Sequence, residues 1–377
     1  MKLRKVRIEN FRAIKETEMV FADALGAIRP LTVLAGPNGS GKTSVLFAIV
    51  QALRGVMGYV TSDVPDPDEL DIHTPRSPGA LSRTPPTISV ILDIEFGDEE
   101  RAAIRKVMAE LSPEERLEDL PNGTVRAVWK YPPERYPDGT PKPVWYLNRT
   151  DPRDAVPWFH GRRHVISGWT SRKLRDRSLL DEIGGIYLFP QDRSLRSRVM
   201  GERLTQGGDA TPGADRRGRD LASVWGVLEY LSNYSRSLPE GVNPEENWEQ
   251  RIRESFNHIC APKEYLGFMY SRDDPFGAPY FKDNGSTYPL HMAASGEQVI
   301  IEYLTRLTYP SPMNHSLVLI DEPEIHLHPA WIRQLYLALP KIGVGNQYIL
   351  TTHAVELYAA AARDEALIEM GELVEKS

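Results

Sequence analysis

One stretch of the chain, residues 30–49, constrains the fold more than any other, and it reads PLTVLAGPNGSGKTSVLFAI. The apolar run Leu31–Ala35 has the length of a buried strand, and residues 44–52 have helical composition. Between them lies GPNGSGKT, a glycine loop whose backbone can wrap a polyphosphate and point successive N–H groups at it. The helix N-terminus that follows adds a positive dipole end. The stretch therefore predicts a nucleoside-triphosphate site in an α/β fold.

Different residues of this loop are expected to contact different parts of the nucleotide and its metal ion. Lys42 is expected to reach the β- and γ-phosphates, and the Thr43 hydroxyl is expected to coordinate Mg²⁺. The loop positions expected to contact the phosphates are Asn38, Gly39, Ser40, Gly41 and Ser44. ATP and Mg²⁺ are therefore the expected cofactors.

Composition places the chain among ordinary globular proteins. It has 377 residues, of which 41% are hydrophobic and 26% charged, with a net charge of −7. No apolar run approaches the roughly 20 residues of a membrane span, and the N-terminus has no apolar signal core. The single cysteine, Cys260, excludes an internal disulfide and suits a reducing compartment. We therefore expect a cytoplasmic protein without a membrane partner.

A second motif, an acidic pair, stands at the end of another apolar strand. Ser316–Ile320 reads SLVLI, and Asp321 and Glu322 follow at its C-terminal end, where α/β sheets place their ligands. Asp321 is expected to hold Mg²⁺, directly or through water. Glu322 is expected to position and deprotonate the attacking water. The pair therefore predicts ATP hydrolysis and not binding alone.

The opening of the chain adds a resemblance to these motifs. Residues 8–16 read IENFRAIKE and precede the glycine loop by some twenty residues, which resembles the ATP-binding-cassette (ABC) ATPases of the RecF, OLD and Structural Maintenance of Chromosomes group. The arginine of this opening often lies near the nucleotide in that group. The resemblance therefore implies that Arg12 contacts the nucleotide; a solvated arginine on an edge turn is the alternative.

The same resemblance implies further site residues in the second half of the chain. Residues 294–298 read ASGEQ and open an amphipathic helix about twenty-five residues before the acidic pair, where ABC-type ATPases carry their signature loop. The serine and glycine of that loop contact the γ-phosphate bound to the opposite subunit in that family. The resemblance therefore assigns nucleotide contacts to Ser295, Gly296 and Glu297, with Glu297 where transporters have a second glycine. Ser295 as a plain helix N-cap is the alternative.

Two polar residues after predicted strands complete the implied site. Gln191, after GIYLF, resembles the glutamine that ABC-type ATPases place near Mg²⁺ and the attacking water. His353, after the strand Gln347–Thr351, matches the switch histidine that senses the γ-phosphate. The acidic pair continues as PEIHLHPAW, residues 323–331, which resembles the DEPE-HLHP run of the soluble branch of the group. Its His326 and His328 are spaced unsuitably for zinc on a helix, and we interpret them as dimer contacts.

The predicted architecture is an ABC-type ATPase head whose two halves flank an inserted subdomain. Residues 1–96 form the N-terminal part of the head, residues 97–263 the insertion, and residues 264–377 the C-terminal part. Prolines and the absence of a heptad pattern argue against a coiled-coil arm, so the insertion should be globular α/β.

The insertion contains the one basic region of the chain. Residues 149–203 hold twelve Lys or Arg against seven Asp or Glu, with tryptophan, phenylalanine and histidine interleaved. Such a mixture can follow a nucleic-acid backbone while its rings stack. It equally suits a subunit interface or a solvated face, and the sequence leaves these alternatives open.

The function that these expectations suggest is an ATP-driven switch. A head of this branch without the Toprim nuclease domain of OLD nucleases resembles the ATPase subunits of anti-phage systems of the Septu, retron-associated or PARIS type. The resemblance implies a homodimer or larger homo-oligomer, formed through the nucleotide sites, that controls a separate nuclease or toxin. The alternative is a RecF-like DNA-repair ATPase that binds DNA directly. A transporter ATPase would need the LSGGQ form of the signature loop, which this chain lacks.

Overall fold

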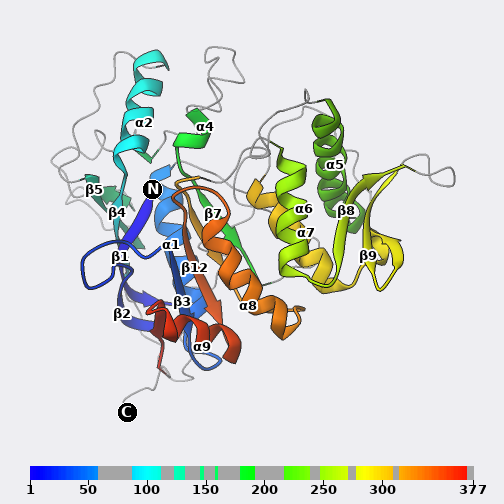
Figure 1. Cartoon of the computed structure of the whole chain (residues 1–377). Helices are drawn as coiled ribbons and strands as arrows, with labels where there is room; N and C mark the ends of the chain where they lie inside the picture. Colours follow the sequence, from blue (N-terminus) through cyan, green and yellow to red (C-terminus); the bar gives the residue numbers. More distant parts are fainter. Residues whose placement is uncertain are drawn as a thin grey trace.

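The computed structural model describes residues 1–57, 87–111, 123–131, 145–147, 158–159, 179–191, 216–237, 247–270, 277–308 and 314–371. Within these residues the chain forms three sheets with helices packed on them (Figure 1). No helix in this part of the chain is long and apolar enough to cross a membrane. Most of the basic region 149–203 lies outside the described residues.

A parallel five-stranded sheet holds the middle of the molecule, in the order β13-β3-β12-β11-β7. Its strands are β3 (Leu31–Ala35), β7 (Ile186–Phe189), β11 (Leu317–Ile320), β12 (Gln347–Thr352) and β13 (Leu367–Glu369). Strands β3, β7, β11 and β12 are buried along their whole length because both faces of the sheet are covered. The expected α/β fold is confirmed.

Two hydrophobic cores lie on the opposite faces of this sheet. Leu317 and Leu319 of β11 face the first core, together with α1 (Lys42–Met57). Val318 and Ile320 face the second core, together with α8 (Pro329–Ala338) and α9 (Val355–Arg363). The alternation of side chains along one strand thus anchors both layers to the strand that carries the acidic pair.

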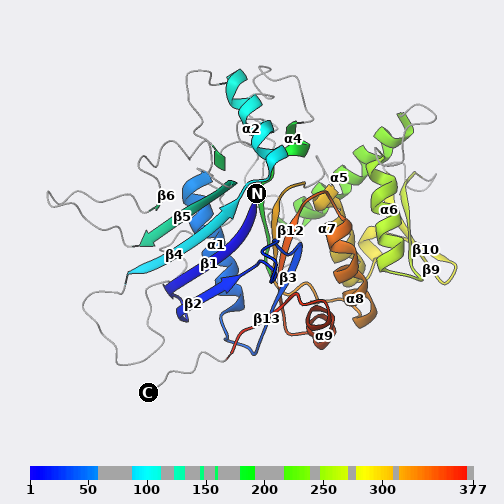
Figure 2. The same ribbon diagram turned by 60° about the vertical axis from the view of Figure 1, so that its left-hand side comes forward.

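An antiparallel sheet closes the first core, in the order β2-β1-β4-β5-β6 (Figure 2). Its strands are β1 (Lys2–Phe11), β2 (Ile14–Val20), β4 (Ile88–Glu95), β5 (Thr124–Tyr131) and β6 (Trp145–Leu147). Helix α1 packs between this sheet and the parallel one. Strand β2 follows β1 directly, because Arg12, at φ 52°, and Ala13 make a two-residue turn that pairs Phe11 with Ile14.

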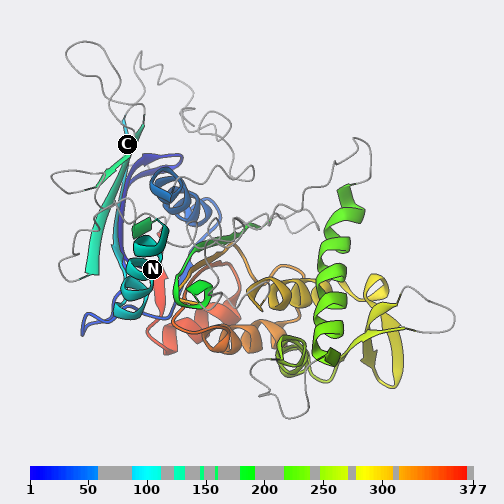
Figure 3. The same cartoon turned by 90° about the horizontal axis from the view of Figure 1, so that it is seen from above.

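A lobe of helices and a three-stranded antiparallel sheet covers part of the second core. It contains α5 (Arg216–Ser237), α6 (Trp248–Ile259), β8 (Glu264–Met269), β9 (Ala278–Asp283), β10 (Ser286–Pro289) and α7 (Ser295–Thr308). Seen from above, the three-stranded sheet and the antiparallel five-stranded sheet lie at opposite ends of the molecule (Figure 3). The other helices among the described residues are α2 (Asp98–Leu111), α4 (Leu179–Glu182), η4 (Leu290–Met292) and η5 (Leu339–Lys341).

The range 97–263, expected as one inserted subdomain, contributes to several layers. Strands β5 and β6 extend the antiparallel sheet, and β7 forms an edge of the parallel sheet. Among the elements described in this range, α5 and α6 alone belong to the lobe with the three-stranded sheet. The described residues of this range are therefore interleaved with the strands of the ATPase head.

Candidate functional site

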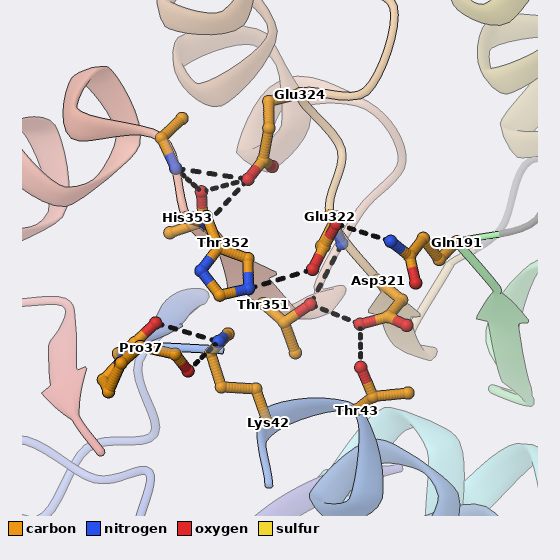
Figure 4. A network of polar contacts seen from close by, with 12 residues as sticks. Pro37, Lys42, Thr43, Gln191, Asp321, Glu322, Glu324, Thr351, Thr352 and His353 are labelled. Carbon is orange, nitrogen blue, oxygen red and sulfur yellow. Dashed lines mark hydrogen bonds and ion pairs between the residues drawn. The ribbon is translucent and has the colours of Figure 1, made fainter. Parts of the chain in front are cut away.

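The candidate site lies at the carboxyl edge of the parallel sheet, where β3, β7, β11 and β12 all end. A cleft of about 310 Å³ opens there and contains most of the residues predicted from the glycine loop and the acidic pair. Its lining residues are Arg12, Ala13, Asn38, Gly39, Gly41, Lys42, Thr43, Ser44, Gln191, Glu322 and His353. The parallel topology therefore brings together residues from both ends of the chain (Figure 4).

The glycines of the loop serve two different purposes. Gly39 and Gly41 have φ values of 80° and 88°, a left-handed backbone that residues with a Cβ adopt only with strain. A Cβ on Gly36 would instead lie 2.3 Å from the carbonyl oxygen of Met370, just after β13. Gly36 therefore permits the close approach of an edge strand, while Gly39 and Gly41 give the loop its curvature.

Lys42 projects back over its own loop. Its Nζ donates hydrogen bonds to the carbonyl oxygens of Gly36 and Pro37 at 2.9 and 3.0 Å. Burial lowers the pKa of Lys42 from its ordinary value, and the carboxylates of Glu322 and Asp321 oppose that shift. The ammonium group is thus held above the loop by two neutral acceptors, which phosphate oxygens can replace with a gain in charge pairing.

The oxygen ligands expected for Mg²⁺ meet beside this lysine. The Thr43 hydroxyl donates to Asp321 Oδ1 at 2.9 Å, and the buried Thr351 hydroxyl donates to the same oxygen at 2.5 Å. Neighbouring ligands of an octahedral Mg²⁺ lie about 3 Å apart, so the Thr43 and Asp321 oxygens fit adjacent positions around that ion. Among the described residues there is no cluster of three His, Cys, Asp or Glu side chains for a transition metal.

Glu322 is held from three sides. Gln191 Nε2 donates to its Oε2 at 2.8 Å, His353 Nε2 lies 3.1 Å from its Oε1, and its backbone N–H donates to Thr351 Oγ1 at 2.9 Å (Figure 4). Its φ of 48° is left-handed, a strained conformation for a glutamate that turns the chain sharply after β11. These contacts fix the carboxylate at the mouth of the cleft.

Burial raises the pKa of the Glu322 carboxyl above its ordinary value. His353 and Lys42 lower it, whereas Asp321 and Glu324 raise it further. A raised pKa makes a carboxylate a stronger base, which is the property required to take a proton from water near neutral pH.

Two residues of this network were not predicted from the sequence. Thr351 is the second-last residue of the buried strand β12 and is followed by another threonine, and Glu324 follows the acidic pair in a turn. The Glu324 carboxylate accepts hydrogen bonds from the Thr352 hydroxyl and from the backbone of residues 353 and 354. Polar residues at the carboxyl ends of neighbouring strands were the available signal, but only the sheet order shows which of them meet.

The signature-like loop lies apart from this cleft. Ser295 is exposed at the start of α7, but neither Ser295 nor Gly296 is among the described residues that line the cleft. A Cβ on Gly296 would lie 2.7 Å from the carbonyl oxygen of His326, so this glycine allows α7 to pack on the turn after β11. The nucleotide contacts expected for Ser295 and Gly296 are therefore not made by the cleft of the same chain.

Glu297 has a structural task that the resemblance did not imply. Its side chain is 1% exposed. Its carboxylate accepts hydrogen bonds from the Ala294 backbone N–H and the Tyr288 hydroxyl, and Lys263 Nζ lies 3.3 Å away. This is a helix-capping arrangement reinforced by a buried ion pair, and it directs the carboxylate inward, away from any phosphate at the loop.

Arg12 and the histidines after the acidic pair have defined positions. Arg12 lines the cleft, with its guanidinium 4.8 Å from the centre of the Phe47 ring on α1. His328 is the N-cap of α8, since its Nδ1 accepts from the Ala330 N–H at 3.2 Å, and His326 is exposed. His328 thus has a local role besides the dimer contact expected from sequence.

The order of these motifs across the sheet defines the class of protein. The glycine loop follows β3, the histidine follows β12, the acidic pair follows β11 and the glutamine follows β7, in four adjacent parallel strands. This is the arrangement of an ABC-type P-loop ATPase. The chain belongs to the family described as "AAA domain, putative AbiEii toxin, Type IV TA system", whose model matches residues 31–359. Membership of this P-loop family implies that the chain binds ATP.

Three curated relatives share a low but extended similarity with the chain. The Septu protein PtuA of Bacillus mycoides (strain KBAB4) is 23% identical, over 93% of this chain and 38% of that protein. The Old nuclease of Escherichia phage P2 is 22% identical, over 96% of this chain and 58% of the nuclease. The retron Ec83 probable ATPase of Escherichia coli is 21% identical, over 95% and 69% of the two chains. The chain thus spans only part of the length of each relative.

A solved structure shows the same fold. The crystal structure of the SmcHead bound to the C-winged helix domain of ScpA matches with a TM-score of 0.50 and 14% identity, covering 95% of this chain and 92% of that one. This likeness confirms the fold that the sequence indicated, and the family model and the curated relatives confirm the resemblance to ABC-type ATPases of this group.

The raised pKa of Glu322 predicts the pH dependence of any hydrolysis at this site. Glu322 must be ionised to accept a proton, so kcat/KM should rise with pH through a pKa above that of an ordinary glutamate. Since His353 lowers that pKa, His353→Ala should move the acidic limb of the pH profile to higher pH and should also lower the maximal kcat/KM. Pre-steady-state or steady-state rates across pH 5–9 (about four pH units) measure both. An acidic limb at the same pH in both proteins would contradict the assignment.

Thr351 should matter for magnesium use because its hydroxyl holds both acidic residues. Thr351→Val keeps the shape but removes the donor to Asp321 and the acceptor for the Glu322 N–H. Hydrogen bonds to charged groups contribute about 1.5–3 kcal/mol, so we expect a roughly tenfold to hundredfold lower rate and a higher Mg²⁺ requirement. Thr351→Ser, which retains the hydroxyl, is the matched control. Equal Mg²⁺ titration curves for the valine variant and the wild type would refute this role.

Proposed function

We propose that this chain is an ATP-hydrolysing switch that closes into a homodimer on ATP and controls a separate effector in anti-phage defence. The observation that carries the hydrolytic part is the position of Glu322. Its carboxylate is held by Gln191 and His353 at the mouth of the cleft, beside the hydrogen-bonded pair of Thr43 and Asp321. A carboxylate so placed, with a raised pKa, suits a general base.

The chemistry follows from the side chains around the cleft. The loop N–H groups and Lys42 bind the β- and γ-phosphates, and Thr43 and Asp321 hold Mg²⁺, which neutralises charge on the phosphates when bound. Gln191 and Glu322 orient a water in line with the γ-phosphorus. The water oxygen bonds to phosphorus, its proton passes to Glu322, and the bond to the β–γ bridging oxygen breaks. The products are ADP and inorganic phosphate, and His353 stabilises Glu322 and senses the γ-phosphate.

The defence assignment is supported by the relatives. Two of them are a Septu protein and a retron-associated probable ATPase, and each aligns over more than nine tenths of this chain. The chain covers 38% of the Septu protein and 69% of the retron protein, so the likeness extends over only part of each relative. Effector control is our inference from that partial likeness. A nuclease or a toxin is the effector class that we propose.

The hydrolytic part is tested by measuring phosphate release from ATP by the purified protein, with and without Mg²⁺. Lys42→Ala serves as the inactive control because it removes the ammonium that pairs with the phosphates. We expect Mg²⁺-dependent release by the wild type and almost none by the variant. Equal release by the two proteins would attribute the activity to a contaminant and overturn the assignment.

The effector is tested by recovering the tagged protein from its native host and identifying co-purifying proteins by mass spectrometry. The proposal predicts a nuclease or toxin whose recovery depends on ATP. The RecF-like alternative predicts DNA binding by the purified protein instead. Filter binding at two salt concentrations separates them, because phosphate contacts weaken steeply with salt. Salt-sensitive DNA binding with no co-purifying effector would favour the alternative.

A further inference from the structure

Glu324 lies two residues beyond Glu322, in the turn between β11 and α8, and it reaches the segment that carries His353. One of its carboxylate oxygens, Oε1, accepts three hydrogen bonds from three consecutive residues. The donors are the Thr352 hydroxyl at 2.7 Å, the His353 backbone N–H at 2.8 Å and the Ala354 backbone N–H at 3.2 Å. Figure 4 shows these contacts on the side of the imidazole away from Lys42.

These bonds fix the backbone of residues 352–354, and with it the residue that carries the His353 imidazole. Ala354 is the N-cap of α9 and provides no side-chain cap. Its backbone N–H is shared between Glu324 Oε1 at 3.2 Å and the Thr352 hydroxyl oxygen at 2.9 Å, and that hydroxyl itself donates to Glu324. The negative charge also lies at the positive end of the helix. The bonds to the backbone N–H groups of His353 and Ala354 therefore order the residue that carries the imidazole.

Glu322 and Glu324, from one turn, thus contact the same short segment, residues 352–354, at two points. Glu324 holds the backbone of residues 352–354, and Glu322 meets the His353 side chain at 3.1 Å. Neither the glycine loop nor the described lining of the cleft includes Glu324. In the described part of the chain its second oxygen, Oε2, is buried and has no hydrogen-bond partner, so the carboxylate is committed to this segment alone.

We infer that Glu324 is a positioning residue, which acts on hydrolysis through His353 without touching the nucleotide. This inference rests on the proposed ATPase function of the site. Loss of Glu324 frees the backbone at residue 353, and His353 no longer meets Glu322 in a fixed geometry. The consequence is a slower chemical step with unchanged nucleotide binding, because a small displacement of an aligned group can cost up to about a hundredfold in rate.

The kinetic test compares Glu324→Ala with Glu324→Gln and with a matched surface control. Glutamine keeps an oxygen that can accept the three donors, so it should retain kcat near the wild-type value. Alanine should lower kcat by about tenfold to a hundredfold while changing KM by less than about twofold. Glu356→Ala removes an exposed carboxylate from the first turn of the same helix and should change neither constant. Equal kcat values for alanine and wild type would overturn the inference.

A second readout is independent of turnover, so failure of the proposed ATPase function remains distinguishable. In histidine-labelled protein without nucleotide, the NMR signal of His353 is assigned by its loss in His353→Ala. Changing Glu322 to Gln should move that signal in the wild type but not in the Glu324→Ala background. If the alanine variant does not fold, Glu324→Asp, which keeps the charge but is too short to reach all three donors, takes its place. A His353 signal that responds to Glu322 equally in both backgrounds would contradict the inference.

Discussion

Glu322→Gln should reduce ATP turnover by about 10²- to 10⁴-fold, the usual contribution of a general base, while the protein still binds ATP. The amide preserves the size of the side chain and can still meet Gln191, but it cannot take the proton of the attacking water. Phosphate release under single-turnover conditions measures the chemical step, and equilibrium titration with labelled ATP measures binding. Glu356→Gln, an exposed carboxylate on α9, is the matched control and should leave both unchanged.

The comparison with Lys42→Ala sharpens this prediction. Lys42 holds phosphates in the ground state and in the reaction, so its loss should weaken binding itself. Glu322 acts only on the reacting water, so its loss should spare binding. A Glu322→Gln protein that hydrolyses ATP at the wild-type rate would remove Glu322 from the role of base. A variant that has lost ATP binding would instead give the residue a structural role.

The parts of the site that the sequence predicted well are those written as contiguous strings. GPNGSGKT after an apolar strand and Asp321–Glu322 after SLVLI each combine a buried strand with polar residues at its C-terminal end. The parallel order of β3, β12 and β11 then forces these ends to one edge of the sheet. Gln191 was a weak signal on its own. The pairing of β7 with β11 is what places it beside Glu322.

Other features depend on contacts between distant segments and left no local pattern. Glu297 looked like a signature-loop residue, yet Tyr288 of β10 and Lys263, just before β8, hold its carboxylate inward. The strands of residues 97–263 looked like an insertion because most motifs of the resemblance lie in the two parts of the chain that flank them. Pairing partners cannot be read from a single strand, so their membership of the head sheets required the structure.

One local signal was present and was not used. Asn284 and Gly285 have φ values of 48° and 83° and turn the chain between β9 and β10. An Asn-Gly pair between alternating residues is a strong indication of a two-residue hairpin turn. This turn places Tyr288 of β10 where its hydroxyl meets Glu297 at the start of α7.

Ser295→Arg should block hydrolysis even though Ser295 lies outside the cleft of its own chain. In the proposed homodimer, the exposed start of α7 in one subunit completes the nucleotide site of the other, as a two-fold arrangement of incomplete sites requires. A bulky arginine there should prevent closure of two heads on ATP but leave ATP affinity of the single chain nearly unchanged. Val344→Arg is the matched control and should behave as wild type. Val344 is 64% exposed and lies where β11 and β12 begin, at the end of these strands that is remote from the cleft.

Mixing Ser295→Arg with Lys42→Ala subunits tests whether the sites are shared. In a mixed dimer one composite site carries both substitutions, and the other has an intact Lys42 from one subunit and an intact Ser295 from its partner. Neither variant alone should hydrolyse ATP, whereas an equal mixture should regain up to about a quarter of wild-type activity, because half of the random dimers are mixed and each has one intact site. Sedimentation with ATP reports closure independently. Full activity of Ser295→Arg alone, or no recovery on mixing when mixed dimers are present, would rule out sites shared between two subunits.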